Sequence, residues 1–558
     1  MLRISILPSI AALLLLTAQL PAQATRLVDP VDPAYRDLEQ LVDGGLIDRF
    51  SFAQRPMSRA AFARAVNEAA TSLSKRQSAL ASTMLAGTPI ATSNPRIEFL
   101  RELIVSLRER LDLPESANEQ LVPRFAAIRS LSADLTSTDQ PTRLIPRNNG
   151  IGAIDAKLNT LLENRQGRPL VQGENALVES THSLEGNFVA FAATPRFSLL
   201  APHDSSRRYD LRLQELQLRF LVRGLAVDIG REYLVWGQGR DVGLLNSNNS
   251  PPLDVLKFSS EVPFTLPWVF RRVGPTRAAI FYADLGSDQN FPHSYLVGYR
   301  ADLLPSANLE LGVSVYTKSG GHGAPRASAT ARLVDILPFL DASAYNNVIG
   351  TRGRFEFSDH YAGFDGRLRV PGLATNLFWE VLLNDFDVRR LESVLWEDAG
   401  HILGIDLPPL TNSGRLRASL EYHHTGIRYY EHHQFTSGQT VHHTVTGDPL
   451  GPDGQGAYGN IDWYASRQRR ASLQFSLERR SNDQYVTVPE PQFGFRKVEV
   501  RPKEWQARML VGWQLLPERQ QLGGQLQFGY ERTRNFDFVQ GDSRNGFLGR
   551  ASFQYRFQ

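Results

Sequence analysis

The chain has 558 residues and a formal net charge of +3, from 61 lysine and arginine residues against 58 aspartate and glutamate residues. This near balance argues against a polyanion-binding surface, so a nucleic-acid partner is set aside. There is no cysteine, so an exported protein of this sequence would depend for stability on burial or on a closed hydrogen-bonded wall.

The first 24 residues have the pattern of a secretory signal peptide. Arg3 supplies a positive charge, ILPSIAALLLLTAQL forms a short apolar core, and residues 22–24 have the A-x-A pattern of a cleavage site. We therefore expect residues 1–24 to be removed and Thr25 to begin the mature chain. An N-terminal membrane anchor is the weaker alternative, because this apolar core is too short for a comfortable transmembrane helix, and no later segment offers about 18 uninterrupted apolar residues.

Residues 25–120 are predicted to form a small helical domain in the periplasm. Asp32, Ser58 and Asn94 can each cap a helix, and apolar residues follow each of them at helical spacing. The stretch AYRDLEQLVDGGLID, followed by MSRAAFARAVNEA, resembles an S-layer-homology type helical module. A plain periplasmic cap explains the same pattern.

From about Leu121 apolar residues recur at every second position, as they do between Trp505 and Leu515. Residues 121–558 could form a soluble β-sandwich or an outer-membrane barrel whose polar face lines a lumen. Polar faces rich in arginine, glutamine and glutamate favour the barrel, as do aromatic strand ends and the aromatic final segment ASFQYRFQ. The length predicts an all-β transmembrane barrel of about 18 antiparallel strands.

One well-patterned strand, LAVDIGREYLVWG, runs into the segment WGQGRDVGLLNSNNSPP at residues 236–252. Its polar groups exclude a lipid-facing position, so we expect it to fold inward or to cover one end. Saccharide sites use aromatic rings for sugar C–H faces, and amide or guanidinium groups for vicinal hydroxyls. A loop that only narrows the lumen is the alternative. The candidate polysaccharide-binding residues are Trp236, Gln238, Arg240, Asn246, Asn248 and Asn249.

The segment REYLVWGQGRDVGLLNSNNSPPLDVLKFSSEVPFTLPW resembles the Wzi family of outer-membrane capsule assembly proteins. LNTLLENRQGRPLVQGEN, YEHHQFTSG, GDPLGPDGQG and the head's YRDLEQLVDGGLID agree with it. The resemblance implies a barrel of about 18 strands with a helical periplasmic head. It also implies a lectin that helps to retain or organise surface polysaccharide. The expected partners are that polysaccharide, outer-membrane lipid and other envelope assembly proteins.

Half of the 12 histidines occur in adjacent pairs, at positions 423–424, 432–433 and 442–443. Neighbours on a strand point to opposite faces, so a pair does not easily place both rings on one metal ion. Loops could still bring them together as a zinc site. Because no cysteine and no HExxH motif supports such a site, we expect no metal and no cofactor.

Carboxylates also recur beside aromatic residues, at Glu380, Asp385, Asp387 and residues 397–398. A glycosidase needs two carboxyl groups across a sugar cleft, but lumen charges that pair with arginines explain the pattern more simply. No G-x-S-x-G motif of a lipase is present. We therefore expect a non-catalytic polysaccharide-binding protein of the outer membrane. A porin or polysaccharide export channel is the alternative, and an outer-membrane glycan hydrolase is the third choice.

Overall fold

The computed structural model describes residues 23–85, 94–115, 123–158, 161, 166–240, 242–325, 358–384, 395–488, 494–518 and 521–557. The predicted signal peptide falls, apart from its last two residues, on positions 1–22, which lie outside this part of the chain.

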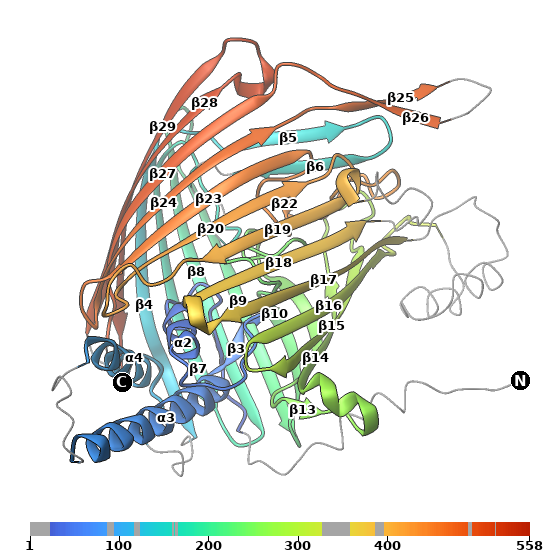
Figure 1. The fold of residues 1–558 in the computed structure, drawn as a ribbon. Helices are drawn as coiled ribbons and strands as arrows, with labels where there is room; N and C mark the ends of the chain where they lie inside the picture. The colour runs from blue at the N-terminus through green and yellow to red at the C-terminus, as the bar shows by residue number, and fades with distance from the viewer. Residues whose placement is uncertain are drawn as a thin grey trace, which may run out of the picture.

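The described residues form a closed antiparallel barrel of 18 strands (Figure 1). The barrel closes where the last strand pairs with the first, with Ala551 opposite Leu135. Closure leaves no sheet edge with unpaired backbone groups, as a wall in lipid requires. The wall strands are β4 (Arg124–Thr138), β7 (Gly173–Glu185), β8 (Val189–Pro202), β9 (Arg208–Val222), β10 (Leu225–Glu232), β12 (Leu253–Ser260) with its continuation β13 (Phe264–Thr265), β14 (Pro275–Asp284), β15 (Tyr295–Ser306), β16 (Leu309–Ser319), β17 (Ser358–Val370), β18 (Thr375–Asn384), β19 (Ala399–Asp406), β20 (Leu416–Thr425), β23 (Gly454–Tyr464), β24 (Arg469–Arg480), β27 (Glu504–Leu515), β28 (Leu522–Arg534) and β29 (Ser543–Arg556).

The two-residue alternation separates an apolar outer face from a polar lumen. On β27, Met509 and Val511 are exposed, whereas Gln506 and Arg508 point inward and are buried. A sandwich core would bury the apolar face instead, so the predicted barrel, and not the sandwich, is confirmed.

The two ends of the barrel differ in the length of their connections. One end has short turns, such as residues 223–224 and 307–308, and the other has long connections, such as 233–252, 426–453 and 481–503. In outer-membrane barrels the short turns face the periplasm and the long loops face outward. The N-terminal helices lie at the end with the short turns (Figure 1), which agrees with the predicted periplasmic head.

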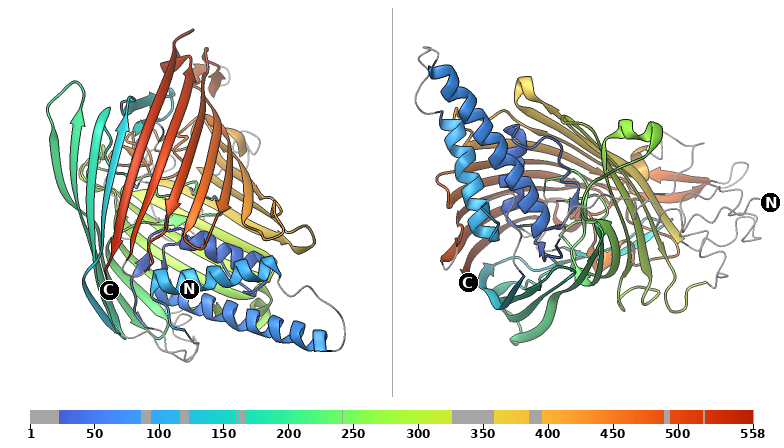
Figure 2. Two further views of the ribbon diagram at one scale, coloured as in Figure 1. Left: turned by 90° about the vertical axis from the view of Figure 1, so that its left-hand side faces the viewer. Right: turned by 90° about the horizontal axis from the view of Figure 1, so that it is seen from below.

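The three predicted helices are present as α2 (Ala34–Asp43), α3 (Arg59–Leu85) and α4 (Pro95–Leu111). As expected, Ser58 caps α3 by accepting a hydrogen bond from the Ala61 N–H at 3.0 Å. Asn94 caps α4 in the same way. Seen from below, α3 and α4 lie side by side at the end of the barrel (Figure 2). Among the described residues, no helix has the length and apolar character needed to cross a bilayer.

Ion pairs join the head to the periplasmic ends of the wall strands. Arg470 on β24 contacts Asp37 of α2 at 2.6 Å. Arg417 on β20 contacts Asp43 at 2.7 Å. The head is therefore attached to the barrel wall through buried charges, not only through the chain connection.

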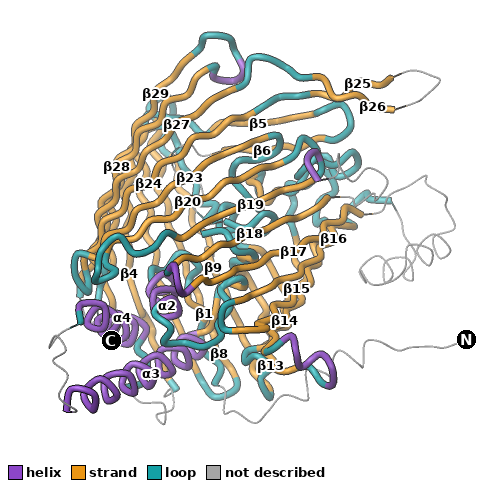
Figure 3. Tube along the Cα trace, viewed as in Figure 1, coloured by secondary structure: helices purple, strands orange, loops and turns teal. Residues whose placement is uncertain are grey.

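Short elements complete the fold, and Figure 3 shows the long helices at one end of a wall made of strands. One strand pair lies within the head, β1 (Leu27–Val28) with β3 (Met57–Ser58), and a second joins the head to the chain after β10, β2 (Gln54–Arg55) with β11 (Val235–Trp236). Hairpins form from β5 (Arg143–Asn148) and β6 (Ala153–Leu158), β21 (Thr440–Val441) and β22 (Thr444–Val445), and β25 (Gln484–Val488) and β26 (Gly494–Val498). The 3-10 helices are η1 (Trp268–Val273), η2 (Pro371–Leu373) and η4 (Phe536–Phe538).

Candidate functional site

The segment that follows β10 leaves the wall and enters the lumen. Residues 232–239 and 242–250 are all buried, and β11 within this segment pairs with β2 of the head. A second segment, 426–453, packs against it, with the Ser247 N–H donating to the Thr446 carbonyl at 2.8 Å. We call residues 234–250 and 426–453 together the plug.

The plug occupies the half of the lumen whose wall combines a buried apolar cluster with inward charges such as Arg300 and Asp365. Trp236 lies edge-on to Phe281 of β14, with ring centroids 4.9 Å apart, and against Tyr316 of β16 at 5.7 Å. Burial of these rings favours this position of the plug. The buried apolar side chains that strands β14 to β19 contribute to the same cluster are Ala279, Phe281, Ala283, Leu296, Tyr316, Tyr361, Phe378, Leu382 and Ile402.

Glu380 of β18 holds the plug by its backbone. Its carboxylate accepts hydrogen bonds from the Leu244 N–H at 2.8 Å and the Gln238 N–H at 3.3 Å. Gly237, the residue before Gln238, has a φ of +135°, and a Cβ there would come within 2.1 Å of the Glu380 carboxylate. Glycine is therefore required at this position for both its backbone angle and its size.

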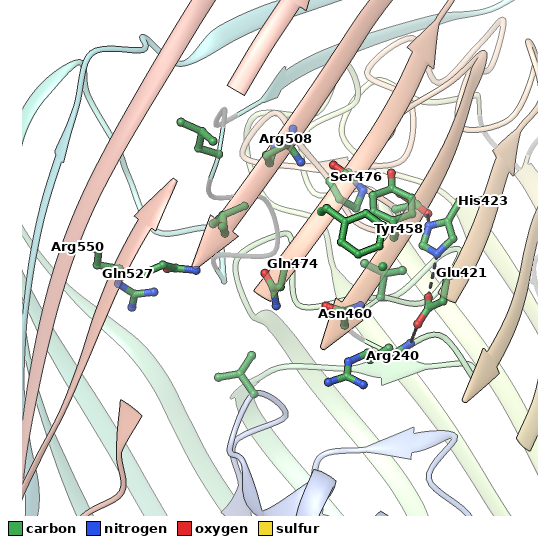
Figure 4. Close-up of a pocket in the computed structure, with 18 of the residues that line it drawn as sticks. Arg240, Glu421, His423, Tyr458, Asn460, Gln474, Ser476, Arg508, Gln527 and Arg550 are labelled. Atoms are coloured by element: carbon green, nitrogen blue, oxygen red, sulfur yellow. Dashed lines mark hydrogen bonds and ion pairs between the residues drawn. The ribbon is translucent and has the colours of Figure 1, made fainter. Parts of the chain in front are cut away.

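The other half of the lumen wall is polar and borders an open cavity of about 370 Å³. Cavities of this size are in the range that small ligands and sugar units occupy in proteins. Figure 4 shows its side chains reaching inward from several wall strands and from the plug. The labelled lining residues are Arg240, Glu421, His423, Tyr458, Asn460, Gln474, Ser476, Arg508, Gln527 and Arg550.

A charged corner of this cavity is fixed by His423. Its Nδ1 lies 2.6 Å from an Asp448 oxygen, and its Nε2 lies 2.9 Å from a Glu421 oxygen (Figure 4). The ring also packs on Tyr458 at 4.4 Å between centroids. Glu421 in turn accepts a hydrogen bond from the Arg240 N–H at 3.1 Å. These contacts link the plug to the wall and set the position of each polar group.

The neighbouring histidine confirms the expectation for adjacent pairs on a strand. His424 points to the outer face, where its ring stacks on Trp396 at 4.0 Å. His423 and His424 therefore cannot share one ion. No group of three metal-ligating side chains suited to an ion occurs in the described part of the chain. Asp385 and Asp387, which sequence analysis noted beside aromatic residues, lie outside the described residues.

Three smaller cavities, of about 230, 140 and 160 Å³, continue from the first along the polar wall. Gln514 and Gln525 line three of the four cavities, and Arg168 also lines three. Because neighbouring cavities share lining side chains, they form one polar tract along strands β23 to β9. The plug borders the first cavity, and the head borders those of about 230 and 140 Å³. Such a tract suits an extended ligand better than a compact one.

All six candidate residues predicted from the sequence belong to the plug. Arg240 lines the cavity, and the other five are buried inside the plug. Arg240 donates to the Ser419 hydroxyl at 3.1 Å and contacts Asp462. Trp236 is 3% exposed, and its ring contacts the wall aromatics Phe281 and Tyr316. Gln238 donates to Asp365 at 2.9 Å and accepts a hydrogen bond from Arg367 at 3.2 Å.

The three asparagines are also buried. The Asn249 amide donates to the Val445 carbonyl at 2.9 Å and so joins the two plug segments. The Asn246 side-chain amide has no hydrogen-bond partner within the described part of the chain, and the Asn248 side-chain oxygen likewise has none. In this arrangement the asparagines shape the plug from within.

Most of the cavity-lining residues are not among the candidates predicted from the sequence. Gln474, Arg508 and Gln527 come from three neighbouring strands, β24, β27 and β28. The sequence does show that they face the lumen, because each of the three occupies a polar position in an alternating strand. Alternation shows which face a residue occupies, but strand register is needed to show which polar residues meet.

Comparison with known proteins decides the family. The sequence profile described as Capsule assembly protein Wzi matches residues 146–547. The chain belongs to the Wzi family. The matched range contains both plug segments and most of the strands that line the cavity, while the lining residue Arg550 lies just beyond its end. The chain is thus an outer-membrane barrel protein.

A solved structure from Escherichia coli shares the fold. It is described as Wzi, an outer membrane protein involved in group 1 capsule assembly and a carbohydrate-binding β-barrel. The alignment has a TM-score of 0.63 and 16% identity, and covers 96% of this chain and 100% of that one. Because the alignment includes the head as well as the barrel, this Wzi-family chain shares the whole architecture with it.

A sequence relative comes from Klebsiella pneumoniae, an uncharacterized 55.8 kDa protein in the cps region. It is 27% identical over 170 residues, which are 30% of this chain and 31% of the relative. The match therefore spans about a third of that protein's length.

Proposed function

We propose that this protein binds a surface polysaccharide, capsular or exopolysaccharide, along the polar half of its lumen and acts in polymer assembly and attachment at the cell surface. The observation that carries the proposal is the cavity of about 370 Å³ lined by amides, hydroxyls and guanidinium groups. The Escherichia coli relative, described as carbohydrate-binding and involved in capsule assembly, supports the same role.

The chemistry of the cavity fits sugars. Planar amides such as Gln474 and Gln527 offer a donor and an acceptor side by side, which matches a pair of vicinal hydroxyls. Arg508 adds a fork of donors, and Tyr458 offers a ring face next to them. The plug gives this wall a fixed opposite side, so a bound chain would meet polar groups from both.

Binding without turnover is part of the proposal. The carboxylates nearest the cavity are already engaged, since Glu421 and Asp448 both contact His423. Glu380 is used to hold the plug backbone. A porin needs an open lumen, whereas here the plug fills the apolar half and the head covers part of the periplasmic end.

The test compares two double variants that each remove a pair of glutamine side chains. Gln474→Ala/Gln527→Ala removes amides from the cavity, and Gln468→Ala/Gln521→Ala removes a hydrogen-bonded pair, 3.0 Å apart, at the periplasmic turns. Loss of two amide contacts is expected to weaken binding of purified polysaccharide about tenfold or more. The turn variant should bind like the parent protein.

Affinity is measured on a glycan array and by titration with the purified polysaccharide. Equal affinity of the cavity variant and the parent would show that this cavity is not the site. Release of sugar from the polysaccharide by the parent protein would contradict binding without turnover.

A further inference from the structure

A row of arginines points out of the barrel at its extracellular rim. Trp505 on β27 is 43% exposed on the outer face. It pairs directly with Arg479 on β24 and with Arg534 on β28. Directly paired residues of antiparallel strands project on the same face. Arg532, two residues before Arg534, is on this face too and pairs with Ala507.

The level of this row in the membrane follows from β27. Trp505 and Trp513 lie near the two ends of the strand, and the exposed Met509 lies between them. Trp513 packs near Trp463, with ring centroids 6.4 Å apart. Aromatic girdles mark the two interfaces of an outer-membrane barrel. The arginine row therefore lies at the outer interface, above the apolar belt.

These three arginines lack the counter-ions that lumen arginines have. In the lumen, Arg219 pairs with Asp228 at 2.8 Å, and Arg300 pairs with Asp302 at 2.8 Å. Within the described ranges, no carboxylate pairs with Arg479, Arg532 or Arg534. The Arg479 Nε is buried and has no hydrogen-bond partner there. Cations on a lipid-facing surface are costly unless they reach water or an anion.

A groove of about 620 Å³ lies above the row, between the strand ends and the connection that carries β25 and β26. Its carboxylates are engaged: Asp483 with Lys503, Asp453 with Arg147 and Glu499 with Arg501. Amides that can meet sugar hydroxyls share the groove. The lining residues that matter here are Gln455, Arg479, Lys497, Lys503, Trp505 and Asn535.

We propose that this row and groove bind the phosphorylated sugar headgroup of an outer-leaflet glycolipid. Guanidinium groups form paired hydrogen bonds with phosphoryl oxygens, and basic clusters at a membrane surface attract anionic headgroups. The amides take the sugar hydroxyls, and Trp505 lies at the boundary with the acyl chains. The site faces lipid, so it is separate from the glycan-binding lumen.

The experiment uses the purified full-length protein in detergent, with lipid binding counted by native mass spectrometry. The probes are lipid A with two phosphates, the same lipid after dephosphorylation, inorganic phosphate, and dextran sulfate as an anionic polysaccharide. The triple variant Arg479→Gln/Arg532→Gln/Arg534→Gln is expected to bind the bisphosphorylated lipid roughly a hundred-fold more weakly. Correct folding is checked by heat-dependent mobility on gels.

A matched control is available on β24, the strand of Arg479, at the opposite rim of the barrel. Arg469 of β24 pairs with Leu515 on the outer face at the periplasmic end. Arg469→Gln removes the same charge from the inner-leaflet side, and its lipid binding should equal that of the parent protein. If the triple variant does not fold, Arg534→Gln alone, at an exposed side chain, should weaken binding about fivefold.

Four results would overturn the proposal. They are equal binding of the dephosphorylated lipid, parental affinity in the arginine variants, inorganic phosphate binding as tightly as the lipid, and a preference for dextran sulfate over the lipid. Parental affinity in the variants would mean that the arginines only extend to water. The proposal is supported if, of the four probes, the parent protein binds only the bisphosphorylated lipid. This binding should be lost in the triple variant and kept in Arg469→Gln.

Discussion

The carboxylate of Glu380 on a wall strand accepts a hydrogen bond from the backbone N–H of Leu244 in the plug, at 2.8 Å. The same carboxylate accepts the Gln238 N–H. One lumen side chain thus satisfies two buried backbone donors of a segment that has left the sheet. The plug is held by this wall residue as well as by apolar packing, and both can be tested.

Glu380→Ala should loosen the plug. The variant leaves two buried N–H groups without acceptors, each at a cost of about 1–3 kcal/mol. We expect higher conductance in planar bilayers than for the parent protein, because the apolar half of the lumen is no longer firmly filled. Glu499→Ala is the control, since that side chain is 64% exposed outside the lumen. Unchanged conductance in Glu380→Ala would show that packing alone holds the plug.

The contribution of apolar packing to holding the plug can be tested at Trp236. Trp236→Ala should lower stability by about 3–5 kcal/mol, since it leaves a hole against Phe281 and Tyr316, and Trp236→Phe should cost less. Combined with Asn248→Ala, the alanine variant should also weaken polymer retention on cells while the barrel still assembles. Unfolding of Trp236→Ala at the parental temperature would contradict this, as would normal retention by the double variant.

Much of the fold could be predicted because lipid leaves few choices. A wall in a bilayer must alternate and must close, so the alternation around Trp505 and the aromatic last strand indicated a barrel, and the chain length gave about 18 strands. The helix caps at Ser58 and Asn94 depend on local hydrogen bonds and were equally readable. The alternation and the caps are each decided within a few residues of chain.

The site was less predictable because it depends on distant pairings. The segment after β10 was correctly expected to fold inward or to cover an end, yet its partner Glu380 was interpreted only as one of many lumen charges. Gln474 and Gln527 meet at one cavity only through the register of three strands. The plug covers the part of the wall that carries the apolar cluster. A lumen amide on that part is covered by the plug, and one on the opposite part borders the open tract.

The junction between head and barrel should fail when Asp37 is replaced. Its side chain is fully buried and contacts both Arg110 of α4 and Arg470 of β24. Asp37→Ala removes the carboxylate that these two buried guanidinium groups share, and Arg110 keeps only the more distant Asp32 at 3.5 Å, so the loss costs about 3–5 kcal/mol. We expect faster proteolysis of the head in the folded barrel. Asp48→Ala, at a side chain that is 72% exposed, should be cut at the parental rate. Equal rates for both variants would rule out this role for Asp37.

The plug should respond to pH through Glu431, which lies in the 426–453 segment outside the spanning strands. Burial raises the pKa of Glu431 to about 8 from its ordinary 4.5, although Arg147, 3.2 Å away, opposes the shift. Between these two values the folded state binds a proton that the unfolded state has lost. Stability contributed by the protonated carboxyl is therefore present at low pH and is lost as pH rises toward 8.

We expect the unfolding temperature, measured by heat-dependent gel mobility, to fall between pH 5.5 and 8.5 in the parent protein. Glu431→Gln keeps the shape of the side chain but removes the titrating carboxyl. Its unfolding temperature should fall less over the same pH interval. Glu499→Gln is the control, because its exposed carboxyl should leave the parental slope unchanged. Parallel curves for the parent and Glu431→Gln would assign the pH dependence to other groups, and the plug would then carry no titrating contact at this position.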